Sequence, residues 1–164
     1  MKRLVIVRHA KAVPYGYEDD YNRKLKRSGK DDAATLSSKV KTMGISPDLI
    51  ISSPAKRAFG TAKIYAKTFD YAKTKIQKEK DLYEGLTTYD FIEMLRIIPD
   101  EVNTVFVFGH NPTVHYLTNN LLRSFNSDTP TCSTAGIEFD IENWSNVDSR
   151  EGKLAFHLKP HNID

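Results

Sequence analysis

Residues 3–10, Arg-Leu-Val-Ile-Val-Arg-His-Ala, decide how we interpret this chain of 164 residues. The centre of the stretch, residues 4–7, is apolar and rich in β-branched side chains, which is typical of a strand buried on both faces of a parallel sheet. This strand ends in two polar residues, Arg8 and His9. The stretch therefore predicts an α/β protein with polar groups at the end of its first strand.

Further along the chain, strand patterns alternate with helical ones. Further strands are predicted over residues 48–52, 76–79, 103–108, 134–141 and 153–158. Helices are predicted over residues 28–43, 53–69, 88–98 and 112–123. Ser28 and Ser53 are expected to cap the first two helices. We expect one three-layer α/β domain over residues 1–164, with a mostly parallel central sheet, helices on both faces and an antiparallel C-terminal strand.

The composition excludes several classes of protein. With 40% hydrophobic and 27% charged residues, the chain is in the ordinary globular range. Its net charge of +3 is too small for a protein that coats nucleic acid unless the positive charge is concentrated in one place. The apolar run 4–7 is too short for a signal peptide or a membrane span, so we expect a cytoplasmic protein with no membrane partner. The single cysteine, Cys132, is expected to be inert packing.

Polar residues follow three of the predicted strands directly. Arg8 and His9 follow the first, residues 52–57 (Ser-Ser-Pro-Ala-Lys-Arg) the second, and residues 109–111 (Gly-His-Asn) the third. Ligands of open parallel sheets bind at the carboxyl ends of the strands, so we expect these loops to place two arginines and two histidines in one crevice. Guanidinium groups and exposed amides at helix N-termini suit a phosphate dianion.

The two histidines have two other interpretations. Either histidine alone could be a polar residue satisfied by a backbone carbonyl, but that interpretation must account for three loops at once. A metal site is disfavoured, because no Asp or Glu adjoins His9 or His110 and the neighbouring arginines repel a divalent cation. We therefore expect no metal and no cofactor.

These segments resemble the histidine phosphatase superfamily. The resemblance extends from about residue 4 to residue 140, and it rests on Arg8-His9-Ala10, Ser53-Pro54-x-x-Arg57-x-x-x-Thr61-Ala62 and Gly109-His110-Asn111. Ala10 stands where many members have glycine. This departure, the short chain, Leu25-x-x-x-Gly29 and Pro130-Thr131-Cys132 are similar to the bacterial phosphohistidine phosphatase branch typified by SixA.

The resemblance implies a role for each residue of the motifs. His9 would be the nucleophile that becomes a phosphohistidine, kept neutral by its positive neighbours and oriented by a backbone carbonyl. Arg8, Arg57 and His110 would surround the equatorial phosphoryl oxygens, where negative charge spreads in the transition state. Glu84 matches the proton donor to the leaving group, with an ordinary loop carboxylate as the alternative.

Other residues near the motifs have more than one interpretation. Ser52 and Asn111 are candidate substrate ligands, although Asn111 is equally a candidate helix cap. The basic stretch 22–30 either steers an acidic phosphoprotein or is ordinary solvated surface. Three tyrosines could line the entrance or pack the loop: Tyr15, Tyr17 and Tyr21.

The spacing of the motifs leaves no room for a lid. Residues 57–84 hold one predicted helix and a short strand, and residues 84–110 hold little beyond one helix. An open pocket suits a phosphorylated side chain on another protein, and phosphohistidine is the substrate that we favour. The alternatives are a phosphatase of small phosphate esters and a module that binds phosphoproteins without turnover. With neither a heptad pattern nor a long apolar edge strand, we expect a monomer. The small net charge leads us to expect no nucleic-acid partner.

Overall fold

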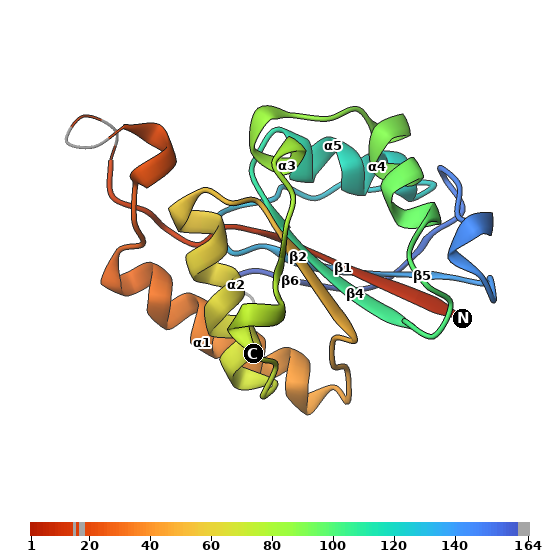
Figure 1. The fold of residues 1–164 in the computed structure, drawn as a ribbon, viewed down its shortest axis with the longest axis horizontal. Coiled ribbons are helices and arrows are strands. Elements are labelled where there is room, and N and C mark those ends of the chain that lie inside the picture. The colour runs from red at the N-terminus through yellow and green to blue at the C-terminus, as the bar shows by residue number, and fades with distance from the viewer. Residues whose placement is uncertain (15, 17–18, 161–164) are drawn as a thin grey trace.

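A six-stranded sheet forms the centre of the computed structural model, which describes residues 1–14, 16 and 19–160. The strand order is β3-β2-β4-β1-β5-β6 (Figure 1). Four strands run parallel: β1 (Lys2–Arg8), β2 (Leu49–Ser52), β3 (Gln77–Lys78) and β4 (Thr104–Gly109). β5 (Thr134–Phe139) is antiparallel to both β1 and β6 (Lys153–Leu158). The predicted α/β class, mostly parallel sheet and antiparallel C-terminal pairing are confirmed.

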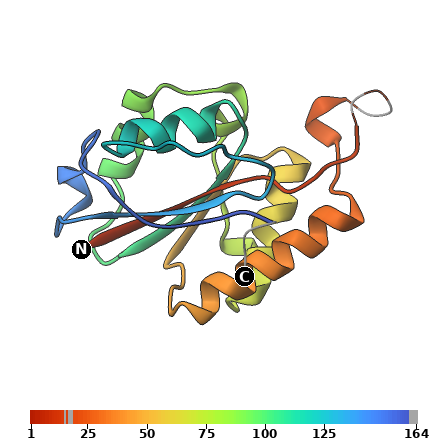
Figure 2. The ribbon, with the colours of Figure 1, turned by 180° about the vertical axis from the view of Figure 1, so that it is seen from behind.

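Helices cover both faces of this sheet (Figures 1 and 2). On one face, α1 (Arg27–Thr42) packs beside α2 (Lys56–Thr68), and α2 contacts β2 and β4. On the other face lie α4 (Thr88–Arg96) and α5 (Thr113–Leu121), with the short α3 (Asp81–Glu84) before them. The described residues also form three single-turn helices: η1 (Asp20–Asn22), η2 (Lys73–Lys75) and η3 (Trp144–Asn146).

The side chains of β1 show why a continuous apolar run marks the central strand. Leu4 and Ile6 pack in the core under α4 and α5, whereas Val5 and Val7 pack in the core under α1 and α2. All four are at most 1% exposed. Each contributes roughly 1.5–3 kcal/mol of burial free energy, so neither face of the strand tolerates a polar side chain.

Two predicted helix caps are wrong. The N-cap of α1 is Lys26, so Ser28 lies inside the first turn of the helix. The N-cap of α2 is Ala55, and Ser53 lies in the preceding loop. Neither Lys26 nor Ala55 makes a side-chain capping bond. Contacts with distant segments hold these helix starts, and a local sequence pattern does not report such contacts.

The start of α1 shows such a contact. The Lys26 amide donates to the carbonyl of Lys11 at 2.9 Å. A Cβ atom on Gly29 would lie 2.2 Å from the same carbonyl oxygen, closer than any side chain can approach. Gly29 therefore lets α1 pack directly against the segment that leaves β1, and this packing connects the helix to the residues that follow His9.

The remaining differences from the expected elements are small. α3 and the three single-turn helices are too short to give a periodic pattern, and they were not predicted. The strand predicted over 134–141 ends at Phe139. Within the described part of the chain, no helix is both long and apolar enough to cross a membrane.

Candidate active site

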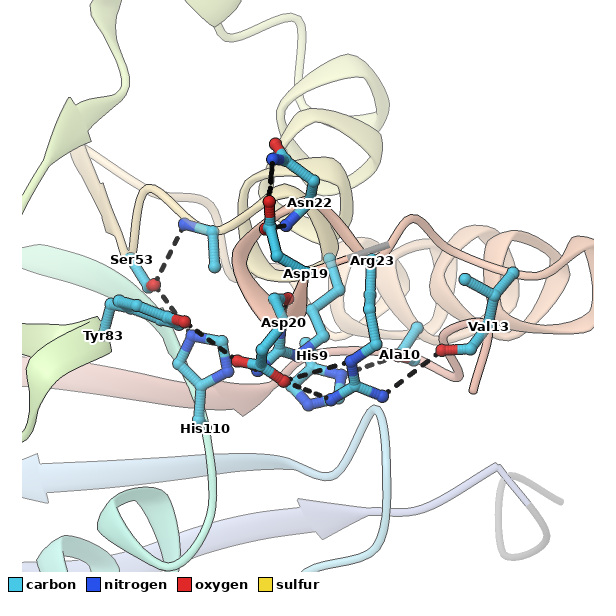
Figure 3. A network of polar contacts seen from close by, with 12 residues as sticks. His9, Ala10, Val13, Asp19, Asp20, Asn22, Arg23, Ser53, Tyr83 and His110 are labelled. Atoms are coloured by element: carbon cyan, nitrogen blue, oxygen red, sulfur yellow. Dashed lines mark hydrogen bonds and ion pairs between the residues drawn. The ribbon is translucent and has the colours of Figure 1, made fainter. Parts of the chain in front are cut away.

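Three loops meet at the carboxyl edge of the parallel strands. His9 follows β1, Ser53 follows β2 and His110 follows β4. The ring centroids of His9 and His110 lie 5.3 Å apart, and His110 Nε2 lies 2.8 Å from Ser53 Oγ (Figure 3). The structure thus brings together the histidine-bearing loops that the strand pattern predicted to converge.

The hydrogen bond of His9 defines its tautomer. Nδ1 lies 2.8 Å from the Ala10 carbonyl oxygen, which can only accept, so Nδ1 carries the proton. Nε2 has no hydrogen-bond partner among the described residues and keeps a free lone pair. Burial, together with the charges of Arg57, Arg8 and Arg23, outweighs the hydrogen bond to Ala10 and lowers the pKa of His9 to about 4. The imidazole is therefore neutral at pH 7.

A threonine of α2 holds the backbone next to His9. Thr61 Oγ1 accepts a hydrogen bond from the Ala10 amide at 3.0 Å and donates to the Arg57 carbonyl at 2.8 Å. Arg57 and Thr61 are one helical turn apart and share a face of α2. The spacing Arg-x-x-x-Thr thus connects the arginine of the second loop to the histidine of the first.

Arg57 is buried, and its guanidinium faces a carboxylate that the sequence analysis did not identify. Arg57 Nη1 donates to the Asp20 carbonyl at 2.6 Å, and Nη2 donates to Asp20 Oδ2 at 3.0 Å. Arg23 donates to Oδ1 through Nε and Nη2, and the Tyr83 hydroxyl donates to Oδ2 at 2.9 Å (Figure 3). We expected a site with positive neighbours only. The structure instead places one carboxylate among the arginines.

Asp20 stays ionised in this network. Partial burial works against its charge, but hydrogen bonds from Tyr83, Arg57 and Arg23 outweigh burial and lower the pKa of Asp20 to about 2. The carboxylate fixes the directions of two guanidinium groups and of one phenol. Such fixed donors cost little reorganisation when an anion enters.

No sequence signal pointed to Asp20 or Tyr83. Asp20 is 37 positions from Arg57 and 63 from Tyr83, and none of these pairs forms a recognisable motif. Tyr83 also packs edge-on against His110, with ring centroids 5.6 Å apart. Of the tyrosines proposed for the entrance, Tyr21 packs edge-on against Tyr83, whereas Tyr15 and Tyr17 lie outside the described residues.

The third loop is held through Thr129. Arg8 Nη1 donates to the Thr129 carbonyl at 3.1 Å, and Asn111 Nδ2 donates to the same carbonyl at 2.9 Å. Asn111 Oδ1 accepts from the His115 amide at 3.2 Å, so this side chain also provides a hydrogen-bond partner for a backbone amide in the first turn of α5. The buried Ser52 hydroxyl donates to the neighbouring carbonyl at 2.9 Å. Both predicted substrate ligands, Ser52 and Asn111, are thus engaged within the protein.

Glu84 is not brought into contact with the site. It ends α3, its side chain is 54% exposed, and its ion-pair partner is Lys80 at 3.5 Å. No contact joins it to His9 or Arg57 in the described part of the chain. The neighbouring Tyr83 is the residue of this segment that reaches the site. A general-acid role for Glu84 stays a prediction.

Three nitrogen atoms around His9 are buried and have no hydrogen-bond partner: Arg8 Nε, Arg57 Nε and His110 Nδ1. Buried polar atoms without a partner are rare in folded proteins. Their concentration on the three side chains that flank one imidazole indicates a site for a ligand rich in acceptor atoms, such as phosphate. No group of three or more metal-ligating side chains lies together in the described parts of the chain.

The model of the histidine phosphatase superfamily (branch 1) matches residues 4–103. The chain belongs to this superfamily. Membership supports phosphatase activity, which is consistent with the convergence of His9, Arg57 and His110 on one site. The match covers the loops after β1 and β2 and ends just before β4. No curated protein matches the chain in sequence.

Solved structures share the fold of this histidine phosphatase across nearly its whole length. The protein histidine phosphatase SixA in complex with tungstate is 20% identical, with a TM-score of 0.84 and 99% of each chain covered. A protein from Agrobacterium tumefaciens described as a phosphohistidine phosphatase SixA is 23% identical, with a TM-score of 0.80 and coverage of 97% of this chain and 98% of that one. The silkworm ecdysone phosphate phosphatase is 14% identical, with a TM-score of 0.66 and coverage of 98% and 93%.

The two site histidines make the protein less stable in mild acid. Burial, followed by the charges of His9 and Arg57, lowers the pKa of His110 to about 3, and His9 titrates at about 4, whereas an exposed histidine titrates at 6.5. The unfolded chain therefore takes up protons below pH 6.5 that the folded chain refuses until pH 4 or lower. The contribution of these two neutral histidines to the free energy of unfolding is complete above pH 6.5 and is lost as the pH falls toward 4.

Each histidine should remove about 2 kcal/mol of unfolding free energy between about pH 7 and pH 5. Urea unfolding measured across this range checks the loss, and nitrogen NMR of the imidazoles separates these two groups from His157, whose pKa burial also lowers to about 4. Asp20 cannot be the source, because its pKa of about 2 confines its effect to pH values below 3.8. Either ring charging near pH 6.5 in the folded protein would contradict the expectation.

Proposed function

We propose that this histidine phosphatase hydrolyses phosphohistidine on other proteins, without a metal, through a covalent phosphohistidine intermediate on His9. The observation that carries the proposal is the state of His9. Its imidazole is neutral, its Nδ1 proton is held by the Ala10 carbonyl, and its Nε2 lies free among buried nitrogen atoms that have no partners. This is the arrangement that an attacking imidazole requires.

In the first half-reaction, the Nε2 lone pair forms a bond to phosphorus, and the bond from phosphorus to the substrate imidazole breaks. The leaving ring keeps the electron pair and departs neutral, because its other nitrogen already carries a proton. Arg8, Arg57 and His110 donate to the equatorial oxygens while charge spreads over them. In the second half-reaction, water attacks the phosphoryl group, the bond to His9 breaks, and inorganic phosphate leaves.

The open surroundings of the site support a protein-borne substrate. A hollow of about 630 Å³ opens to solvent beside the site; Arg8 and Asn111 line it, whereas His9, Arg57 and His110 do not, and on the side of Glu84 the described residues add the four-residue α3. An open site admits a side chain that stands on a protein surface but encloses a small metabolite poorly. Among the proteins with this fold, one is a protein histidine phosphatase.

Comparison of a phosphohistidine peptide with phosphate esters tests the proposal. A peptide whose histidine has been phosphorylated with phosphoramidate should be hydrolysed with a higher kcat/KM than nitrophenyl phosphate or sugar phosphates, and EDTA should not change either rate. Because a protonated imidazole leaves without an acid, Glu84→Gln should slow hydrolysis of the esters more than hydrolysis of phosphohistidine. A clear preference for sugar phosphates would refute the proposed substrate. Phosphate binding without turnover would refute the proposal that the protein is an enzyme.

A further inference from the structure

A groove outside the active site is lined by an unusual concentration of lysines. It lies along α2 beside the start of α1 and has a volume of about 690 Å³. Six of its lining residues are Lys24, Lys30, Lys56, Lys63, Lys67 and Lys73. All six are exposed. No other hollow described for this chain carries so many groups of one charge.

These lysines are not neutralised by the protein. None of the six forms an ion pair in the described residues, and the lining includes no carboxylate. The opposite charge is gathered elsewhere: a second hollow at α3 and α4 is lined by Glu79, Asp81, Asp90 and Glu93. The modest net charge of +3 therefore conceals a strong local field at the groove.

The floor of the groove is apolar. Leu25, Ile64 and Tyr71 line it, and Gly60 lets the Leu25 side chain lie close to α2, since a Cβ on Gly60 would be 3.3 Å from Leu25 Cδ1. On α2, Lys56, Lys63 and Lys67 lie on the same stripe as Gly60 and Ile64, at the spacing of one helical face. The groove thus offers a central apolar strip with positive charges along its sides.

We propose that this groove docks an acidic amphipathic helix of the phosphoprotein substrate, with the apolar residues of that helix on the floor and its carboxylates facing the lysines. The proposal rests on the proposed function, since the docked helix belongs to the protein whose phosphohistidine enters the site. Lys56 directly precedes Arg57 of the active site, and Lys67 lies roughly 16 Å further along α2. One partner can therefore reach both places at once.

Two features favour a protein over a nucleic acid as the occupant. The groove contains lysines but no arginine, the residue that forms paired hydrogen bonds with phosphate groups. Only one of the three apolar side chains on its floor, Tyr71, is aromatic, whereas a bound single strand stacks successive bases on several aromatic rings. A stripe of point charges around an apolar floor matches the helix-in-groove mode of peptide recognition.

A pair of charge-reversal variants tests the groove. The variant Lys63→Glu/Lys67→Glu changes two exposed groove lysines, and the control Lys39→Glu/Lys153→Glu makes the same change in net charge at exposed positions outside it. The probe is a fluorescent synthetic helix with leucines on one face and glutamates on the other. Its Kd should rise at least about tenfold for the groove variant and change less than about twofold for the control.

The same helix, extended by a phosphohistidine, connects docking to turnover. Its kcat/KM should fall at least about tenfold in the groove variant, whereas the rate on nitrophenyl phosphate should stay unchanged. Equal binding of the helix by the two variants would overturn the proposal that the groove is the docking site, whatever happens to turnover. Preferential binding of an oligonucleotide, or loss of a dimer in the groove variant, would also overturn it. Failure of the wild type to hydrolyse phosphohistidine while it still binds the helix through the groove would instead refute the proposed function.

Discussion

Replacing His9 with alanine is expected to lower phosphate release by about 10⁴-fold or more and to abolish covalent labelling. The imidazole supplies the attacking electron pair, and no neighbour can take its place: His110 Nε2 is 2.8 Å from Ser53 Oγ, and burial keeps its ring fixed. Brief incubation with a radiolabelled phosphodonor, followed by acid and alkali treatment of the denatured protein, measures the intermediate. Wild type should carry a label that is stable in alkali and lost in acid.

A second histidine variant serves as the control for this experiment. His157 lies outside the site, where its Nε2 contacts the hydroxyl of Ser133. His157→Ala should keep the label and most of the rate, whereas His9→Ala should lose both while its circular dichroism spectrum stays unchanged. A label that survives in His9→Ala would show that another residue is phosphorylated, and the assignment of the nucleophile would then be wrong.

Replacing Arg57 with alanine is expected to lower kcat by about 10²–10³-fold. Arg57 is only 5% exposed and its guanidinium carries a buried Nε with no partner, so it is poised to donate to a phosphoryl oxygen as negative charge develops. Arg57→Lys should recover little of this loss, because an ammonium group does not reproduce the planar fork. Single-turnover kinetics on nitrophenyl phosphate measures the chemical step directly.

Asp20→Ala distinguishes the two roles that Arg57 can have. If Arg57 acted only by holding Asp20, removal of either partner of the ion pair at 3.0 Å would cost the same activity. We expect Asp20→Ala to cost less than about a tenth as much as Arg57→Ala, since it leaves the guanidinium in place although less firmly oriented. Equal losses in the two variants would contradict a direct contact between Arg57 and phosphate.

The strands that end at the site could be predicted from sequence because burial on both faces leaves a continuous apolar record. Leu4 to Val7 and residues 104–108 are such runs, and each ends at the polar residues that form the site. The same reasoning failed for the helix caps at Ser28 and Ser53. A backbone contact with Lys11 takes the place of capping by Ser28, and Ser53 lies in the loop before α2, where its hydroxyl contacts the His110 ring and accepts from the Ala55 amide.

The Asp20 network and the lysine groove could not be predicted from the sequence. Asp20, Arg23 and Tyr83 meet only because η1 lies against the start of α2 and α3 brings the Tyr83 hydroxyl to Asp20. Similarly, the basic stretch 22–30 looked like one charged surface, yet the structure divides it. Arg23 turns into the site, Lys24 and Lys30 line the groove, and Leu25 is buried between them.

By itself, the sequence determined the α/β class, the position of His9 at the end of a buried strand, and the family to which the chain belongs. These features depend on hydrophobic periodicity and short motifs, which are local properties of the chain. Only the tertiary structure decided that a carboxylate orients the arginines, that Tyr83 rather than Glu84 reaches the site, and that six lysines line one groove. Such features depend on contacts between residues tens of positions apart, and no local pattern encodes their geometry.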